Sequence, residues 1–278
     1  MNDDALSPVV AMMLVLTVVV SLFSLWNTIY LPGLKQQSEV QHLKQVEEGM
    51  VRIDSAIRDA IFYKHNGSLS IPVPLGGGDI MFNNLRSGGE LKTEISENEA
   101  VITLTINESS TYEVYLSNVT YTPVSNFWIA QGYTWQDGVV NVTKGNVTTP
   151  LLLERRMPEE QAKFAKDLIT VTNRDGFTIA YVNMTPSTRN VISGNGIAQF
   201  GITVISSVPV LLYNVTNVTL EFSGSLPTSL YNTTNSSLAA NNNLTYKSTN
   251  YPQYMIYHNN SPTVNLNLER LDIVLSVE

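Results

Sequence analysis

The chain of 278 residues contains no cysteine, which excludes disulfide bridges, thiolate zinc sites, iron–sulfur clusters and cysteine nucleophiles. Charge is also scarce, because only 14% of the residues are charged, against about a quarter in an average soluble domain. The 24 acidic side chains outnumber the 16 basic ones and give a formal net charge of -8. A sequence-independent grip on nucleic acid needs clustered Lys and Arg, so we exclude nucleic acid as a partner.

Groups suited to catalysis or metal binding are few. The three histidines, His42, His65 and His258, have no second histidine or carboxylate at metal-ligand spacing, and we interpret each as a surface residue. The chain has no Gly-x-Ser-x-Gly, Gly-x-x-x-x-Gly-Lys or His-Glu-x-x-His pattern. The sequence therefore predicts a protein that is not an enzyme, with no cofactor and no metal.

One long apolar run begins close to the amino terminus. From Ala5 to Leu34 no side chain is charged, and Val9 to Leu31 is dominated by Val, Leu, Met, Phe and Ile. A bilayer core needs about 20 helical residues, so this run is long enough to cross one. It is too long for the apolar part of a cleaved secretory signal, and no positive residues precede it. We therefore expect a membrane-spanning helix.

The residues from Lys35 to Tyr63 have the pattern of an amphipathic helix. Apolar residues recur at steps of three and four along a narrow seam, which can lie against another helix or against a domain. Pro32 and Gly33 alone interrupt continuity with the apolar run, and we expect a kink or a locally unwound turn there. The seam consists of Val40, Leu43, Val46, Met50, Ile53, Ile57 and Ile61.

The amino-terminal residues Asp3 to Val10, followed at once by the apolar helix and its amphipathic extension, resemble the start of archaeal type IV pilin-like proteins. The resemblance implies a class III signal peptide, with a leader of residues 1–4 that a prepilin peptidase cleaves between Asp4 and Ala5. It implies that the helix of residues 5–63, apolar over 5–34 and amphipathic over 35–63, leaves the membrane and packs with copies of itself as the core of an extracellular pilus-like filament, with help from the pilus assembly machinery. The residues expected in that core are Val9, Val10, Met13, Leu14, Leu16, Val19, Val20, Phe23 and Trp26.

Leaders of this family commonly carry Lys or Arg before the cleavage point, whereas this chain has Asp3 and Asp4 there. The alternative is therefore an uncleaved signal anchor, a single-pass membrane protein with an extracellular binding or adhesion domain that does not polymerise.

Residues 64–278 change to short β-rich runs punctuated by Gly, Pro and Asn. In Ala100–Ile106 alternation places Ile102, Leu104 and Ile106 on one face, toward a core. We predict an α+β protein, a long helix followed by a mainly antiparallel β-sandwich-like domain of one or two lobes, and consider parallel pairing improbable because few helical crossovers are evident. The expected strands are Ala100–Ile106, Tyr112–Tyr121, Gly138–Val142, Leu168–Thr172, Phe177–Val182, Ala198–Ser206, Val210–Phe222 and Val264–Val277.

Two further segments of this region have predicted structures. Arg156 to Leu168 is expected to form a helix, because Pro158 and two glutamates suit its first turn. If the domain has two lobes, we expect the boundary between them near residues 151–168. Tyr231 to Asn243, rich in Asn, is expected to be an exposed loop. Trp128, Tyr133 and Trp135 form the one aromatic cluster with binding potential, although core packing is the commoner role of such residues.

The acceptor pattern Asn-x-Ser/Thr occurs twelve times, against roughly five expected by chance. This excess indicates a glycosylated, outward-facing surface, in keeping with a role in adhesion or contact with surface glycans. The acceptors are Asn66, Asn107, Asn118, Asn141, Asn146, Asn183, Asn214, Asn217, Asn232, Asn235, Asn243 and Asn259.

Overall fold

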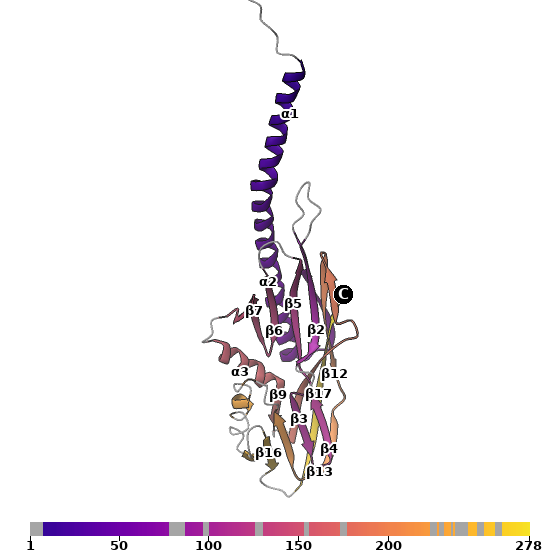
Figure 1. Cartoon of the computed structure of the whole chain (residues 1–278). Helices are drawn as coiled ribbons and strands as arrows, with labels where there is room; N and C mark the ends of the chain where they lie inside the picture. The colour runs from indigo at the N-terminus through magenta and orange to yellow at the C-terminus, as the bar shows by residue number, and fades with distance from the viewer. Residues whose placement is uncertain are drawn as a thin grey trace, which may run out of the picture.

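The computed structural model describes residues 8–77, 87–96, 100–125, 130–152, 156–172, 177–222, 227, 231–234, 236, 244–248, 253–258 and 263–278. Its helix and its β-rich domain confirm the predicted α+β class. A helical rod projects from one end of an elongated domain of β-strands (Figure 1).

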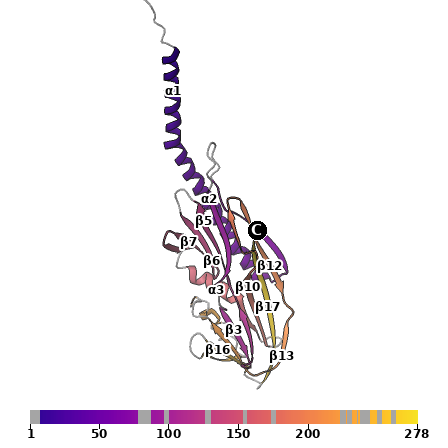
Figure 2. The same ribbon diagram turned by 45° about the vertical axis from the view of Figure 1, so that its right-hand side comes forward.

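The rod is nearly continuous. An α-helix α1 (Pro8–Leu25) runs into a single π-helical turn, η1 (Trp26–Tyr30), and then into α2 (Leu31–Tyr63). At about 1.5 Å per residue these elements span about 84 Å. α1 lies clear of the domain, whereas the carboxyl-terminal part of α2 enters it (Figure 2).

The expected irregularity lies one turn earlier than Pro32 and Gly33. α-Helical structure resumes at Leu31 and continues through both residues. Pro32 has no N–H to donate into the preceding turn. In the turn before Pro32 the hydrogen-bond pattern changes to that of a π-helix, in which the Leu31 N–H donates to Trp26 O, five residues back.

The first sheet holds six strands in the order β1-β12-β17-β10-β9, with β13 also paired to β17. One pair, β10 with β17, is parallel, which corrects the prediction that parallel pairing is improbable. That prediction assumed a helical crossover, but the chain between the two strands passes instead through six strands, β11–β16, which are divided among the three sheets. The strands are β1 (Gly67–Pro74), β9 (Ile169–Thr172), β10 (Phe177–Pro186), β12 (Ile197–Ser206), β13 (Val210–Val215) and β17 (Val264–Val277).

The second sheet is antiparallel, with the order β11-β2-β5-β6-β7-β8. Its β6–β7 hairpin turns at Asp137-Gly138, where both residues have positive φ, as the Asp-Gly signal predicts. The strands are β2 (Gly88–Ile95), β5 (Ser117–Ser125), β6 (Gln131–Gln136), β7 (Val139–Lys144), β8 (Val147–Pro150) and β11 (Val191–Gly194).

The third sheet is antiparallel and has the order β15-β16-β14-β3-β4. The side chains of Ile102, Leu104 and Ile106 are buried, which confirms the alternation predicted for that strand. The strands are β3 (Ile102–Ile106), β4 (Ser110–Val114), β14 (Val218–Phe222), β15 (Leu244–Ser248) and β16 (Gln253–His258).

Several strand boundaries differ from the prediction. The run expected over Tyr112–Tyr121 is divided between β4 and β5, because the chain leaves the third sheet for the second after Val114. The run expected over Val210–Phe222 is likewise divided, after Asn214 adopts a positive φ. Seven strands were not expected from the sequence, namely β1, β2, β6, β8, β11, β15 and β16.

The predicted helix of residues 156–168 is confirmed as α3 (Met157–Leu168). In the segment expected to be an exposed loop, Tyr231–Thr234 is instead helical and Thr234 is buried, with the Tyr231 ring 6.2 Å from that of Phe222. Residues 235 and 237–243 of that segment lie outside the described residues. The small contact with Phe222 gives this segment a place to pack that its composition does not indicate.

One hydrophobic cluster joins α2, α3 and strands of all three sheets. α2 contacts β1 and β12 of the first sheet and β6 and β7 of the second. At Gly49 the helix lies directly on β1, since a Cβ built there would lie 3.5 Å from Val73 Cγ2, an ordinary contact distance. The lower half of the helix is thus part of the domain core.

Candidate assembly interface

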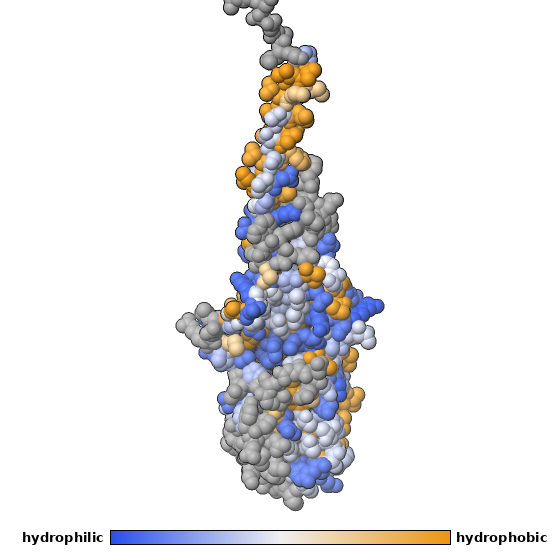
Figure 3. Space-filling view, in the orientation of Figure 1, coloured by the Kyte–Doolittle hydropathy of each residue, from blue (hydrophilic) through white to orange (hydrophobic). Residues whose placement is uncertain are grey.

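α1 is an apolar helix that the rest of the chain does not cover. None of its residues is buried, and it is long and apolar enough to cross a membrane by length and composition. Figure 3 shows the hydrophobic surface of this helix above a more polar domain. All nine residues expected in a filament core are exposed, namely Val9, Val10, Met13, Leu14, Leu16, Val19, Val20, Phe23 and Trp26.

Polar side chains within the apolar rod bond back to the helix. Thr17 Oγ1 donates to Met13 O at 2.8 Å, and Ser21 Oγ donates to Thr17 O at 2.7 Å. Asn27 Nδ2 donates to Phe23 O at 3.0 Å. These bonds lower the cost of placing such groups in an environment without water, whether it is lipid or protein.

Two aromatic side chains mark the end of the apolar run. The rings of Trp26 and Tyr30 are stacked, with centroids 5.0 Å apart, on the π-helical turn. Trp and Tyr gather where apolar and aqueous surroundings meet. The π-helical turn therefore coincides with the change from an apolar to an amphipathic helix.

The amphipathic seam packs into the β domain over most of its length. Leu43, Val46, Met50, Ile53, Ile57 and Ile61 are buried. Val40, by contrast, is 51% exposed and does not pack into the domain. Toward its upper end the buried face of the helix shifts onto polar residues, with Lys35, Glu39 and His42 buried in its place.

The burial of His42 corrects its interpretation as a surface residue. Its side chain lies beside Gly77, its Nε2 atom is 3.2 Å from Pro74 O, and its ring meets that of Tyr121 edge-on at 6.2 Å. This site lies beyond the apolar run, and burial lowers the pKa of His42. Burial likewise raises the pKa of Tyr121 to about 12, and its hydroxyl donates to Leu75 O at 3.2 Å.

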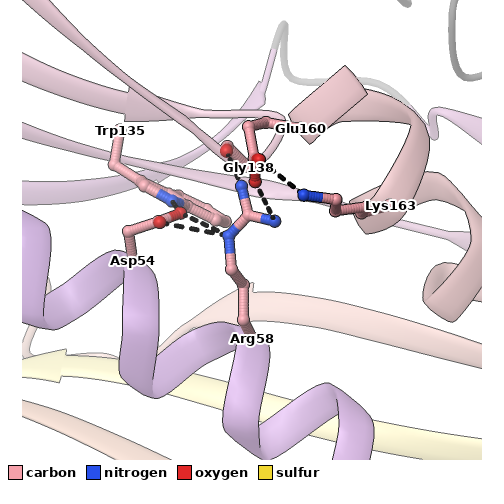
Figure 4. A network of polar contacts seen from close by, with 6 residues as sticks. All are labelled: Asp54, Arg58, Trp135, Gly138, Glu160 and Lys163. Atoms are coloured by element: carbon pink, nitrogen blue, oxygen red, sulfur yellow. Dashed lines mark hydrogen bonds and ion pairs between the residues drawn. The ribbon is translucent and has the colours of Figure 1, made fainter. Parts of the chain in front are cut away.

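A polar network ties α2 to the β6–β7 hairpin (Figure 4). Trp135 Nε1 donates to Asp54 Oδ1 at 2.8 Å, and Asp54 pairs with Arg58 at 3.1 Å. Arg58 also donates to Gly138 O, the carbonyl at the hairpin turn. Because the network is partly buried, its hydrogen bonds are screened less than those of an exposed pair.

The same arginine reaches α3. Arg58 Nη1 lies 3.4 Å from Glu160 Oε2, and Glu160 accepts a bond from Lys163 at 2.7 Å. The Lys163 hydrogen bond, with the charge of Arg58 also contributing, lowers the pKa of Glu160. Glu160 was expected only as a first-turn residue of its helix. Asp54 and Arg58 were not singled out from the sequence, although an acidic residue four positions before an arginine is a recognisable helix pair.

The aromatic residues expected from the sequence are mostly core residues. Tyr133 and Trp135 are each 1% exposed, and Trp128 lies outside the described residues. The Tyr133 hydroxyl is 3.1 Å from Glu47 Oε2 and 3.3 Å from Leu43 O, and burial raises the pKa of Tyr133. Tyr133 and Trp135 therefore pack α2 against the second sheet and are too buried to form a binding surface.

The predicted glycan acceptors divide by exposure. Asn183 is 3% exposed, and its amide donates to Asp272 at 2.8 Å, so a glycan there contradicts the fold. Asn118, Asn141 and Asn217 are half-buried, and Asn235, Asn243 and Asn259 lie outside the described residues. The exposed acceptors are Asn66, Asn107, Asn146, Asn214 and Asn232.

The remaining candidates from the sequence are the leader junction and the histidines His65 and His258. The leader junction at Asp4 and Ala5 lies outside the described residues, as does the side chain of His258, and His65 is exposed. Among the described residues, no group of three or more His, Asp or Glu side chains is arranged to hold a metal ion.

No family model matches the chain, and no curated protein or solved structure is similar enough to count as a match. The likeness to pilin-like proteins therefore depends on the residues from Asp3 to Val10 and on the helix that follows them, and it stays a prediction.

Proposed function

We propose that this protein is the structural subunit of an extracellular filament resembling the archaeal type IV pilus. In this proposal the leader is removed after Asp4, and the apolar rod then passes from the membrane into a bundle of identical rods. The observation that carries the proposal is the complete exposure of α1, an apolar helix of 18 residues with no buried side chain. Such a surface needs either lipid or other protein to cover it.

The attachment of the rod supports a structural role. The seam residues bury α2 in the core, and the Asp54–Arg58 pair joins it to two further elements. A load along the rod would therefore act on the packed domain and not on a flexible linker. This is the mechanical property that a filament subunit needs.

In the proposal the β domain forms the outer surface of the filament, carries glycans on its exposed acceptors and mediates adhesion or surface contact. Asn146 and Asn232 are exposed, and a glycan on them would extend into solvent. The protein would reside in the membrane as a precursor and at the cell surface after assembly, with the prepilin peptidase and the assembly machinery as transient partners.

The alternative is a single-pass anchor with an extracellular adhesion domain that does not polymerise. It is favoured by the length of the apolar helix and by the aromatic pair at its end. The two functions differ in two measurable properties, the mature amino terminus and the polymeric state.

Amino-terminal sequencing of the surface protein, together with electron microscopy of sheared filaments, tests the proposal. A mature protein beginning at Ala5 and present in filaments supports it, whereas an intact Met1 in a lipid-bound monomer supports the anchor.

A pair of substitutions tests the role of the rod directly. Val15 is 64% exposed on α1, and Val147 is 63% exposed on the β domain. An aspartate at the centre of an apolar helix costs about 3 kcal/mol in hydrocarbon, so Val15→Asp should abolish filaments while Val147→Asp retains them. Filaments of normal yield from Val15→Asp would reject packing of the rods as the basis of assembly.

A further inference from the structure

A polar hollow of about 320 Å³ lies between β4 of the third sheet and β10 and β17 of the first. It lies in the half of the β domain away from α1 (Figure 1). We call it the tyrosine pocket and define it by Tyr112, Glu113, Tyr115, Tyr181, Asn183 and Arg270.

The floor of the tyrosine pocket is buried and its polar groups are fixed. Tyr181 and Asn183 are each 3% exposed. Asn183 accepts a bond from the Tyr115 N–H at 2.9 Å and donates to Asp272 at 2.8 Å, so both ends of its amide are held.

The guanidinium of Arg270 is fixed at the rim in the same way. Its Nε and Nη2 atoms donate to Asp272 Oδ1 at 2.8 and 2.6 Å, and Tyr181 lies opposite Arg270 in the register of β10 and β17. Asp272 receives a further bond from Ser207 at 3.2 Å. A planar donor group held in this manner loses little conformational freedom when a ligand binds.

The walls are aromatic and half-buried. Tyr112 and Tyr115 are partly exposed, and the Tyr115 hydroxyl donates to Glu113 Oε2 at 2.5 Å. Tyrosine rings offer an apolar face and a polar tip at low entropic cost. The pocket thus combines ring faces with planar groups that donate and accept hydrogen bonds.

Charge narrows the class of ligand. A second hollow of about 230 Å³ adjoins the pocket, since Tyr181 and Arg270 line both, and adds Lys64 and Glu269. The charged residues that line the two hollows, together with Asp272, are two cations, Lys64 and Arg270, and three carboxylates, Glu113, Glu269 and Asp272. With no excess of positive charge, the site is poorly suited to phosphate, sulfate or uronate groups.

We propose that the tyrosine pocket binds a neutral pyranose unit of a carbohydrate. The C–H face of the sugar ring would lie on Tyr112 or Tyr115, and its hydroxyl groups would bond to Glu113 and Arg270, above the floor formed by Tyr181 and Asn183. A volume near the lower end of the range for ligand pockets fits one small ring with its nearest waters. This inference rests on the adhesion role in the proposed function and names a ligand class for it, but it does not depend on polymerisation.

This assignment also places saccharide binding away from the aromatic residues that the sequence first suggested. Tyr133 and Trp135 are 1% exposed and have no free ring face. Asn183, expected to carry a glycan, forms part of the floor of a pocket that would bind one.

Saturation-transfer difference NMR on the full chain tests the proposal, in a detergent without a sugar headgroup so that the micelle does not compete. The probes are the methyl glycosides of glucose, galactose and mannose, with methyl glucuronide and adenosine as competitors of other chemistry. We expect transfer to the ring protons of at least one neutral glycoside and little to the two competitors.

Two tyrosine substitutions locate the binding. Tyr115→Ala should weaken it by roughly tenfold, as for a residue that carries a main contact. Tyr213→Ala removes a tyrosine that is 65% exposed on β13, outside the pocket, and should leave binding unchanged. If thermal melting shows Tyr115→Ala to be unfolded, Glu113→Gln takes its place, and a severalfold loss is expected from removal of the exposed carboxylate.

The proposal is overturned if no neutral glycoside gives transfer, if the glucuronide or adenosine binds in preference, or if binding is the same in Tyr115→Ala and Tyr213→Ala. None of these outcomes bears on filament formation, which the substitution at Val15 tests separately.

Discussion

Replacement of Gly138 by alanine should be among the most damaging single-methyl changes in the β domain. Gly138 has φ +74°, a conformation that costs an L-residue about 1–2 kcal/mol. A Cβ at this position would also lie 2.7 Å from both Cβ and Cγ of Phe164. Phe164 is 1% exposed, so it cannot move aside without disturbing the core, and overpacking of this kind costs about 1–3 kcal/mol.

The two costs together come to about 2–5 kcal/mol. For a folded unit of this size, each kcal/mol shifts Tm by about 2–4 °C, so Gly138→Ala should lower Tm by roughly 4–20 °C. The measurement is thermal unfolding followed by far-ultraviolet circular dichroism. Tryptophan fluorescence adds a local signal, because the Trp135 ring packs edge-on against Phe164 at 5.7 Å.

Gly145→Ala supplies the matched control. Gly145 also lies in a hairpin turn with positive φ, at +59°, but nothing lies within 4 Å of a Cβ built there. It should therefore show the backbone cost alone, and the difference between the two variants measures the contact with Phe164. If both variants melt at the same temperature, α3 does not pack on the β6–β7 turn as described, and the reasoning fails.

Three further predictions concern the buried residues Met50, His42 and Asn183. Met50→Ala should lower the free energy of unfolding in urea by about 2–5 kcal/mol, because Met50 is fully buried. Val51→Ala is the control and should cost less than about 0.5 kcal/mol, because Val51 is 46% exposed. Equal effects of the two substitutions would contradict the packing of α2. Because the pKa of His42 is lowered in the folded protein, the neutral ring contributes stability above pH about 6.5, and this contribution is lost as the pH falls below that value. His42→Gln should therefore flatten the fall in the free energy of unfolding between pH about 7 and 5. An unchanged slope would count against burial of a neutral ring. Peptide mass spectrometry should find Asn183 without a glycan in folded protein and any occupied acceptors among exposed residues such as Asn146; a modified Asn183 would be incompatible with its bond to Asp272.

The helix and the general class of the domain could be predicted because their signals are local. The uncharged run and the seam are visible as periodic patterns within the helix itself. Val40 follows the same period as Leu43 but is exposed, because the β domain reaches that level of the helix on the side of Glu39 and His42. Which side a domain covers is set by its tertiary packing and not by the period.

The strands that sequence analysis missed carry misleading residues. β1 contains Pro72 and Pro74, which argue against a strand in a sheet interior. In the first sheet β1 is the terminal strand, paired with β12, so its prolines need not donate to a second neighbour. β2 carries Glu90, Lys92 and Glu94 on one face, and their charges conceal the buried Leu91 and Thr93.

The contacts that hold α2 in the domain could not be predicted from sequence patterns, because their partners lie far apart in the chain. Trp135 and Asp54 are 81 positions apart, and Arg58 and Gly138 are 80 apart. Their types are ordinary for exposed helix and hairpin residues. Only the packing of α2 between the first two sheets brings them together. The tyrosine pocket could not be predicted for the same reason, since its residues come from β4, β10 and β17 and are distant in the sequence.

The two halves of the rod differ in burial, because the upper half is exposed and the lower half is packed in the domain core. Between Leu43 and Ile61 the seam spans about 27 Å of helix at about 1.5 Å per residue, and the residues of the Arg58 network lie within that length. A tether that only held a domain near a bilayer would need no such depth, because a short flexible linker would serve as well. Burial of the lower half fixes the direction of the exposed upper half relative to the domain. A fixed direction allows many copies to be added in one repeated geometry, which is the condition that distinguishes a filament from a collection of anchored molecules.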